Sequence, residues 1–346
     1  MAEQEQEPCP IVGIGASAGG LEALSELVKA IPERTGFAYV IIQHLSPDHP
    51  SIMDQLLATH AVIPVRKIED RQTIEPDTIY VLPAGPSATI EGSRLHLHER
   101  NPEPGLRTPI DRFFQSLADA RGHSAFGVIL SGTGSDGTVG VRAIKEAGGF
   151  AIVQQSESAR FPGMPDSAAS TGLVDFALKP QKIPDRLVEI LTHRDWLPSE
   201  AGRQELRTDI ENSLSDIVKA LDDQEGHDFS KYKPGTLIRR IERRMTLLRQ
   251  RDVSEFIASL NNSAEERARL LQDFLIGVTK FFRDEKAFHK LRQEVVLPLL
   301  DKDQSNFRIW VPGCSTGEEA YSIAILFAEA MSDAKDSRHW QIFGTD

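Results

Sequence analysis

Ser17 stands between small residues in the segment Gly-Ala-Ser-Ala-Gly, where an apolar run that predicts a strand (10–15) meets one that predicts a helix (21–30). The spacing of Gly15, Ser17 and Gly19 fits the Gly-x-Ser-x-Gly turn, which exposes a serine hydroxyl between a strand and a helix. A serine hydroxyl is a poor nucleophile unless a base takes its proton. The segment therefore predicts acyl-transfer chemistry at Ser17, with a base and an orienting acid elsewhere in the chain.

Two further predicted strand ends supply these groups. The apolar segment 37–43 leads directly to His44, and the segment 126–131 leads into a glycine-rich loop that contains Asp136. In an open parallel sheet, functional groups gather at the edge where the strands have their carboxyl ends. His44 is therefore the predicted general base, and Asp136 is the predicted acid that orients its imidazole ring.

Each of these motifs also has another interpretation. Glycines around Ser17 are typical of a dinucleotide-binding turn, but that turn calls for an acidic residue at the end of the second strand. Gln43 and His44 stand there instead. Asp136, between glycines, is also typical of a turn or of the cap of a helix that follows from Thr138. The joint occurrence of the three groups favours the catalytic interpretation.

The motifs resemble the catalytic segments of the chemotaxis protein-glutamate methylesterase family, CheB. The resemblance is carried by the segments 15–20, 43–45, 75–83, 108–114, 132–137 and 161–165. It implies that Ser17, His44 and Asp136 form the triad. It also implies an oxyanion donor at the backbone N–H of Thr133, where the family usually has methionine. The expected activity is hydrolysis of glutamyl methyl esters on chemoreceptors without a cofactor, and the resemblance also allows glutamine deamidation at the same site.

A second glycine-bounded turn follows a predicted strand at 307–312. The segment Gly-Cys-Ser-Thr-Gly-Glu-Glu (313–319) leads into an apolar helix at 320–330, and a later strand ends at Asp346. Two glutamates at a helix amino terminus complement the helix dipole, but they also suit a ligand that carries hydroxyls or positive charge. A carboxylate at the end of the second strand is where a ribose hydroxyl binds in doubly wound folds.

The segment 313–324 resembles the cofactor motif of the chemotaxis receptor methyltransferase family, CheR, and the segment 279–284 resembles a second element of that family. The resemblance implies that S-adenosylmethionine is the cofactor of this half and binds at Thr279, Arg283, Glu319 and Asp346. Gly277 stands where the family commonly has asparagine, and glycine has no side chain to make that polar contact. Because the chain stops just after the second strand, we expect it to be a piece of a longer protein that performs the methyl transfer.

Basic residues concentrate in the segment 231–251 of a chain whose net charge is −12. Ile238, Ile241 and Met245 share one helical face, so the arginines flank an apolar stripe. A solvated charged face is the simplest interpretation, whereas the CheR resemblance implies docking to acidic receptor helices. The predicted docking residues are Arg239, Arg240, Arg243 and Arg244. Nucleic-acid binding is not expected, because aromatic residues do not interleave with these charges.

Short apolar strands alternate with helices before residue 195, which predicts an α/β fold with a doubly wound, mainly parallel sheet. Helical periodicity dominates afterwards, and a new strand begins near residue 307. The predicted domains are a methylesterase domain (9–194), a linker (195–205), an all-α subdomain (206–300) and the incomplete start of a domain that binds S-adenosylmethionine (301–346).

Composition limits the remaining functions. The chain has no apolar run long enough to span a membrane, no signal peptide and only two cysteines. We therefore expect a cytoplasmic protein without a metal site, which reaches the membrane only through chemoreceptor-like partners that carry methylatable glutamates. Two other classes stay open. One is a non-catalytic signalling scaffold, and the other is a small-molecule ester hydrolase, whose usual order of Ser, Asp and His differs from the order here.

Overall fold

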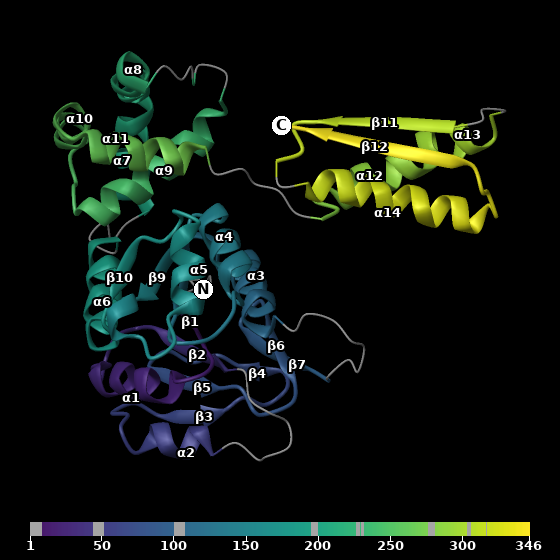
Figure 1. Ribbon diagram of the computed structural model, residues 1–346. Coiled ribbons are helices and arrows are strands. Elements are labelled where there is room, and N and C mark those ends of the chain that lie inside the picture. The colour runs from purple at the N-terminus through teal and green to yellow at the C-terminus, as the bar shows by residue number, and fades with distance from the viewer. Residues whose placement is uncertain are drawn as a thin grey trace, which may run out of the picture. The chain divides into compact units, whose positions relative to one another are not determined.

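The structure is a computed structural model, and the residues that it describes are 9–43, 52–99, 108–194, 200–225, 229, 232–275, 281–302, 306–315 and 317–346. The chain divides into two compact units, Met1–Ile276 and Gly277–Asp346. The first unit contains an α/β domain followed by a group of helices, and the second is a smaller α/β unit (Figure 1).

A seven-stranded sheet forms the centre of the first unit, and every strand pair in it is parallel. Its strands, in spatial order, are β10 (Phe176–Leu178), β9 (Phe150–Gln154), β8 (Ala125–Ile129), β1 (Ile11–Ala16), β2 (Ala38–Gln43), β5 (Thr78–Val81) and β3 (Val65–Lys67). The central strands are buried along their length, as expected for a parallel sheet covered on both faces. This confirms the predicted fold class.

Helices cover both faces of this sheet. One apolar core joins it to α3 (Pro109–Arg121), α4 (Thr138–Glu146) and α5 (Gly163–Ser170). The other core joins it to α1 (Gly20–Ala30), α2 (Met53–Ala58) and α6 (Ile183–Arg194). A separate three-stranded sheet contains β7 (Arg94–His98), which pairs antiparallel with β6 (Ser87–Glu91) and with β4 (Gln72–Thr73). In the seven-stranded sheet, side chains at alternate positions along a strand enter different cores. This fixes the register in which neighbouring strands pair.

Five helices follow the α/β domain in the first unit and share an apolar core of their own. They are α7 (Glu200–Asn212), α8 (Leu214–Glu225), α9 (Pro234–Leu248), α10 (Val253–Asn262) and α11 (Ala264–Phe274). Helix α7 begins within the range assigned to the linker, and the two compact units divide after Ile276 rather than at residue 300. The domain boundaries given above stay predictions.

A buried network of four charged side chains joins these helices to the α/β domain. Lys145 of α4 lies 2.8 Å from Asp175 and 3.3 Å from Asp273 of α11 (Nζ to carboxylate oxygen). Arg243 of α9 pairs with both carboxylates and donates from Nε to the carbonyl of Gly149 at 2.9 Å. Burial favours the neutral form of Asp175, but the charges of Arg243 and Lys145 outweigh it and lower the pKa of Asp175 to about 2. None of the four side chains is more than 8% exposed.

Three of the four arginines predicted to dock a receptor therefore have internal partners, and this corrects their assignment. Arg240 is buried and donates to the carbonyls of Lys145 and Glu146, while Arg243 belongs to the charge network. Arg244 is buried against Glu266 of α11, with Nε 2.9 Å from the carboxylate. Guanidinium groups that are desolvated and paired in this way are not available to a partner helix. Arg239 is exposed, and its docking role stays a prediction.

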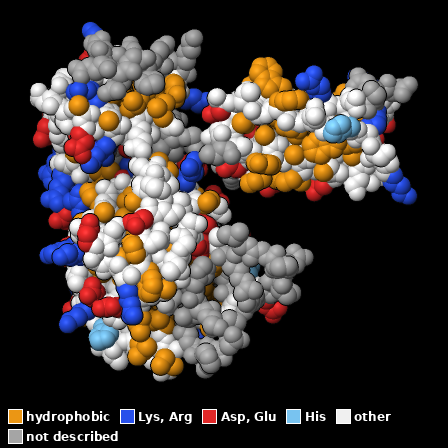
Figure 2. Space-filling view, viewed as in Figure 1, with side chains coloured by type: hydrophobic (Ala, Val, Ile, Leu, Met, Phe, Trp, Pro, Cys, Tyr) orange, Lys and Arg blue, Asp and Glu red, His pale blue; other side chains and the backbone are white. Residues whose placement is uncertain are grey.

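The second unit pairs two parallel strands, β11 (Asn306–Pro312) and β12 (His339–Thr345), with the helix α14 (Glu318–Asp333) between them in sequence. Two short helices precede them, α12 (Glu285–Leu291) and α13 (Leu297–Leu300), and they are joined by a π-helical turn. Leu326 and Phe327 of α14 pack with Val296 in its core. Figure 2 shows hydrophobic side chains on the surface of this unit, and Trp310 and Phe343, which are cross-strand neighbours, are both exposed.

Within the described ranges, no helix combines the length and the apolar character that crossing a bilayer would need. No group of three or more potential metal-ligating side chains is found among the described residues either.

The charge network predicts that its arginine is essential for stability and that an exposed neighbour is not. Arg243→Met leaves two buried carboxylates without their main partner, which should destabilise the first unit by roughly 3–5 kcal/mol. Arg239→Met, one turn earlier on the same helix and exposed, should change stability by less than about 0.5 kcal/mol. Urea unfolding of both variants measures the difference. Equal midpoints for the two would contradict a stabilising network.

Candidate active site

Ser17 lies in a sharp turn between β1 and α1. Its backbone N–H donates to the carbonyl of Ser131 at 3.0 Å, and its own carbonyl accepts from the N–H of Gly20 at 2.9 Å. Gly19 has φ = 69° in this turn, and a Cβ there would lie 2.9 Å from the ring of Phe161. The strand, turn and helix thus follow the geometry that the glycine spacing predicted, and they leave Ser17 half-buried at the carboxyl edge of the sheet.

The loop after β8 packs directly against Ser17. A Cβ on Gly132 would lie 2.9 Å from the Cβ of Ser17 and 2.1 Å from the sulfur of Met164, so only glycine fits between them. Thr133 follows in the same loop and is exposed. Its backbone therefore belongs to the segment next to Ser17, and its role as an oxyanion donor stays a prediction.

Asp136 is buried at the end of this loop, and α3 fixes its carboxylate. Its two oxygens accept the backbone N–H groups of Ile110 at 3.1 Å and Asp111 at 2.9 Å, in the first turn of α3. Asp136 thus caps a helix, as the alternative interpretation allowed, although the capped helix is α3 rather than the one that begins at Thr138. Each carboxylate oxygen has two lone pairs, so this capping leaves acceptor capacity for an imidazole.

His44 lies outside the described residues. The strand that leads to it ends at Gln43, which is the register partner of Ala16 in β1. Gln43 also lines the same pocket as Ser17. β2 therefore ends beside the Ser17 turn, and the assignment of His44 as the base stays a prediction.

Asp111 is a buried acid beside Asp136 that the sequence analysis did not single out. Its carboxylate accepts the N–H groups of Gly137 and Gly140, each at 2.8 Å. Asp136 thus caps α3, the helix that carries Asp111, and Asp111 caps α4, the helix that follows Asp136. Burial, together with the negative charge of Asp136, raises the pKa of Asp111 to about 6. The only sequence signal for Asp111 is its place in Pro-Ile-Asp at a helix start. Acidic residues are common in the first turn of ordinary helices, so this signal does not indicate a special role.

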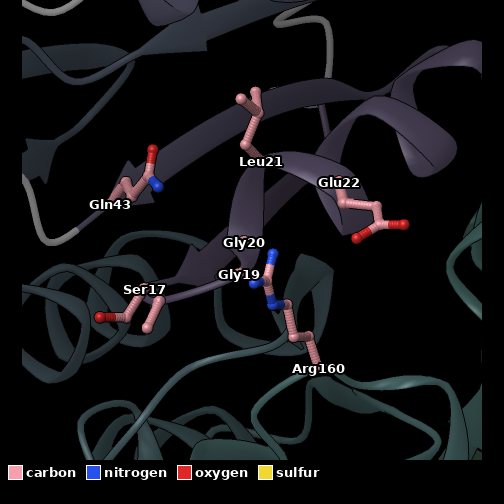
Figure 3. Close-up of a pocket in the computed structure, with 8 residues that line it drawn as sticks. Ser17, Gly19, Gly20, Leu21, Glu22, Gln43 and Arg160 are labelled. Carbon is pink, nitrogen blue, oxygen red and sulfur yellow. The ribbon is translucent and has the colours of Figure 1, made fainter.

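The pocket at Ser17 has a volume of about 550 Å³ and opens to solvent (Figure 3). Its walls are the Ser17 turn, the first turn of α1, Gln43 and Arg160. The sequence analysis did not identify Arg160, although it directly precedes one of the recognised motifs. The pocket therefore holds one candidate nucleophile and one cation from a different segment of the chain.

The glycine-rich turn of the second unit brings its loop together with Asp346. The N–H of Ser315 donates to the Asp346 carboxylate at 3.1 Å, and the N–H of Phe282 donates to the buried hydroxyl of Ser322 at 2.9 Å. The second bond attaches the segment that contains Arg283 to α14. Glu319 and Arg283 are both exposed, and Thr279 lies outside the described residues.

This turn is suited to the predicted cofactor. No atom lies within 4 Å of the position that a Cβ on Gly313 would occupy, so the backbone is open to a ligand. The nearby acidic side chains, Glu319 and Asp346, match the hydroxyls and the positive charge of S-adenosylmethionine better than they match a phosphate. The assignment of these residues to cofactor binding stays a prediction.

The raised pKa of Asp111 predicts a pH-dependent loss of stability. An aspartate in an unfolded chain has a pKa of about 3.9. Between that value and about 6, the folded protein keeps a proton that the unfolded chain has released, so stability falls as the pH rises through this window. Asp111→Asn cannot ionise and should lack this component. Urea unfolding between pH 4 and 7.5 measures it, with Asp119→Asn, exposed on the same helix, as the control. The same pH slope in all three proteins would contradict a raised pKa.

Comparison with known sequences identifies the same regions. The CheB methylesterase profile matches residues 12–187, the all-α domain of CheR methyltransferase matches 212–275, and the domain of CheR methyltransferase that binds S-adenosylmethionine matches 277–346. A "Protein-glutamate methylesterase/protein-glutamine glutaminase 3" of Anaeromyxobacter dehalogenans is 34% identical over 181 residues, which are 51% of this chain and 52% of that protein. A corresponding protein of Desulfotalea psychrophila is 33% identical over 184 residues.

One relative matches across all three regions. An "Uncharacterized 104.1 kDa protein in hypE 3'region" of Rhodobacter capsulatus is 38% identical over 315 residues, which are 85% of this chain and 33% of that protein. The crystal structure of the Thermotoga maritima CheB methylesterase catalytic domain has a TM-score of 0.49 and 26% identity, and covers 53% of this chain and 98% of that one. The chain thus spans between a third and about half of the length of these curated relatives. It belongs to the CheB methylesterase family and carries this domain fused to the all-α and S-adenosylmethionine-binding domains of CheR.

Proposed function

We propose that the α/β domain hydrolyses glutamyl methyl esters on chemoreceptor-like proteins, with Ser17 as nucleophile, His44 as general base and Asp136 as the orienting acid. The observation that carries this proposal is the hydrogen bond from Ser17 to Ser131, which places the serine turn against the loop that leads to Asp136. The pairing of β1 with both β2 and β8 supports it, because all three residues follow adjacent parallel strands.

In the proposed reaction, His44 takes the Ser17 proton while the hydroxyl oxygen attacks the ester carbonyl. Backbone donors at Thr133 stabilise the oxyanion, and one such donor is typically worth about 3 kcal/mol. The tetrahedral intermediate collapses to a glutamyl-serine ester as His44 protonates the departing methanol. Water, activated by the same imidazole, then releases the glutamate carboxylate and restores Ser17. A glutamine amide can enter the same sequence, with ammonia as the leaving group.

The partners follow from this substrate. We propose that the substrates are chemoreceptor-like proteins with modified glutamates on the cytoplasmic side of the membrane, and that the protein reaches the membrane through its receptor. The curated relatives named for both methylesterase and glutaminase activity support the same two reactions here.

Replacement of the nucleophile tests the esterase. Ser17→Ala should lower kcat for methanol release from a methyl-esterified receptor fragment by a factor on the order of 10³ or more. Ser25→Ala is the matched control, because Ser25 is a half-buried serine of α1 whose hydroxyl donates to the carbonyl of Leu21. It should leave kcat unchanged. Receptor binding without methanol release by the unmodified protein would favour a scaffold, and equal turnover of generic esters would favour a broad ester hydrolase.

We further propose that the second unit contributes to glutamate methylation in the whole protein. S-adenosylmethionine, when bound, supplies the electrophilic methyl group. Glu319 and Asp346 hold its polar groups at the turn after β11, and Thr279 and Arg283 complete the site from the preceding segment. The acceptor glutamate is already ionised at neutral pH, so the chain positions it and need not supply a strong base.

Cofactor binding gives a readout that does not depend on methyl transfer. Glu319→Gln removes one exposed carboxylate at the start of α14 and should weaken binding of S-adenosylmethionine about tenfold, the size expected when one hydrogen bond to a charged group is lost. Glu329→Gln, exposed near the other end of the same helix, should leave the affinity unchanged. Isothermal titration calorimetry measures both. Equal affinities would place the cofactor away from Glu319.

A further inference from the structure

Arg160 is held beside the candidate nucleophile by a rigid part of the fold. The next residue, Phe161, donates its N–H to the hydroxyl of Ser131 at 3.0 Å and accepts the N–H of Gly132 at 2.9 Å. A Cβ on Gly19, in the Ser17 turn, would lie 3.1 Å from the Cβ of Arg160. The Cβ of Arg160 is thus packed against the turn that carries Ser17, and only the outer part of the side chain can move.

The guanidinium group of Arg160 has no anionic partner among the described residues. The structure records one interaction for it there, a contact with the ring of Phe161 at 5.8 Å from the centroid. Glu22 lines the Ser17 pocket, and Glu22, Glu26 and Glu157 line an adjoining hollow that also contains Arg160. No ion pair joins any of these carboxylates to Arg160. Figure 3 shows the guanidinium end of Arg160 beside Gly19 and Gly20. The pocket therefore contains an exposed cation that the fold does not use.

The proposed esterase reaction does not require this cation. The glutamyl methyl ester is uncharged, and the developing negative charge is assigned to backbone donors at the loop after β8. The amino end of α1 borders the same pocket, and no side chain caps it, so its dipole adds to the positive potential there. An arginine in such a place is suited to a carboxylate, which it can bind through two parallel N–H groups.

We propose that Arg160 binds an ionised carboxylate of the substrate that neighbours the esterified glutamate, and that it is a specificity-determining residue for acidic segments. This inference rests on the proposed esterase function. It separates two steps of recognition: Ser17 reacts with the neutral ester, while Arg160 selects segments in which a second acidic residue lies beside that ester. Glu22, on the opposite side of the pocket, weakens this selection by repelling the same carboxylate.

Paired substrates test the proposal with the full 346-residue chain. Two helical peptides carry one glutamyl methyl ester each and differ only in having Glu or Gln at the neighbouring positions. The unmodified protein should hydrolyse the Glu peptide with a kcat/KM about tenfold higher than the Gln peptide, the ratio expected for one hydrogen-bonded charge pair. Arg160→Gln should remove this preference and leave the rate on the Gln peptide within about twofold. Arg160→Glu should reverse it, in favour of a third peptide with Lys at those positions.

Two further variants serve as controls. Arg34→Gln removes another exposed arginine, between α1 and β2, and should keep the full preference for the Glu peptide. Glu22→Gln should increase that preference, because it removes the carboxylate on the other side of the pocket. A preference that persists in Arg160→Gln, or is absent from the unmodified protein, would overturn the proposal. An Arg160→Gln effect of equal size on both peptides would show that the arginine acts on the ester or on the product carboxylate instead.

A binding measurement keeps this test separate from the test of the esterase itself. In the Ser17→Ala background, which should bind substrate without turnover, the Glu peptide should bind about tenfold more tightly than the Gln peptide, and Arg160→Gln should make the two affinities equal. Equal affinities before that substitution would overturn the role of Arg160 even if the esterase is confirmed. Selective binding without hydrolysis by the unmodified protein would support Arg160 while contradicting the proposed catalysis.

Discussion

The position of β1 between β2 and β8 is the constraint on which the candidate active site depends. Parallel strands end at one edge, so the Ser17 turn after β1 and the loop after β8 are brought together even though they are far apart in sequence. Close packing then defines the distances. Gly132 fits between Ser17 and Met164 with no room for a side chain, and Ser131 accepts the Ser17 N–H. The loop after β8 therefore cannot move away from the serine without opening a gap in the core.

The two buried aspartates beside this loop extend the same constraint. Asp136 accepts N–H groups of α3, while Asp111 of α3 accepts N–H groups at the start of α4. The start of α3 and the start of α4 are thus each held by an acid from the other segment, which fixes the end of the loop after β8 that leads into α4. Burial and the nearby negative charge of Asp136 disfavour the ionised form of Asp111 and raise its pKa. This arrangement fixes the orientation of the Asp136 carboxylate. An acid that orients an imidazole ring needs such a fixed position.

Much of this was accessible from the sequence because it depends on local patterns. Glycine spacing around Ser17 and the apolar runs on either side predicted the strand, the turn and the helix, and the structure contains them as β1 and α1. The roles of Arg240 and Arg243 were not accessible in the same way. Helical periodicity places them beside an apolar stripe, but their partners on the α/β domain lie 68 to 95 residues away in sequence. A single sequence gives no signal that such a partner exists, so buried and solvated arginines look alike.

Arg160 and Arg243 show how the surroundings decide what an arginine does in this fold. Arg243 is surrounded by two carboxylates and a backbone carbonyl, so its charge is fully used in joining α9 to the α/β domain. Replacing such a group would leave buried anions unpaired, so the positive charge at this position stabilises the fold. Arg160 is exposed, lies on a rigid segment and contacts no carboxylate within the described residues. It stays solvated and has no ion-pair partner in the part of the chain that the structure describes, so its charge is available to a ligand. The difference follows from position alone, because the two side chains have the same chemistry.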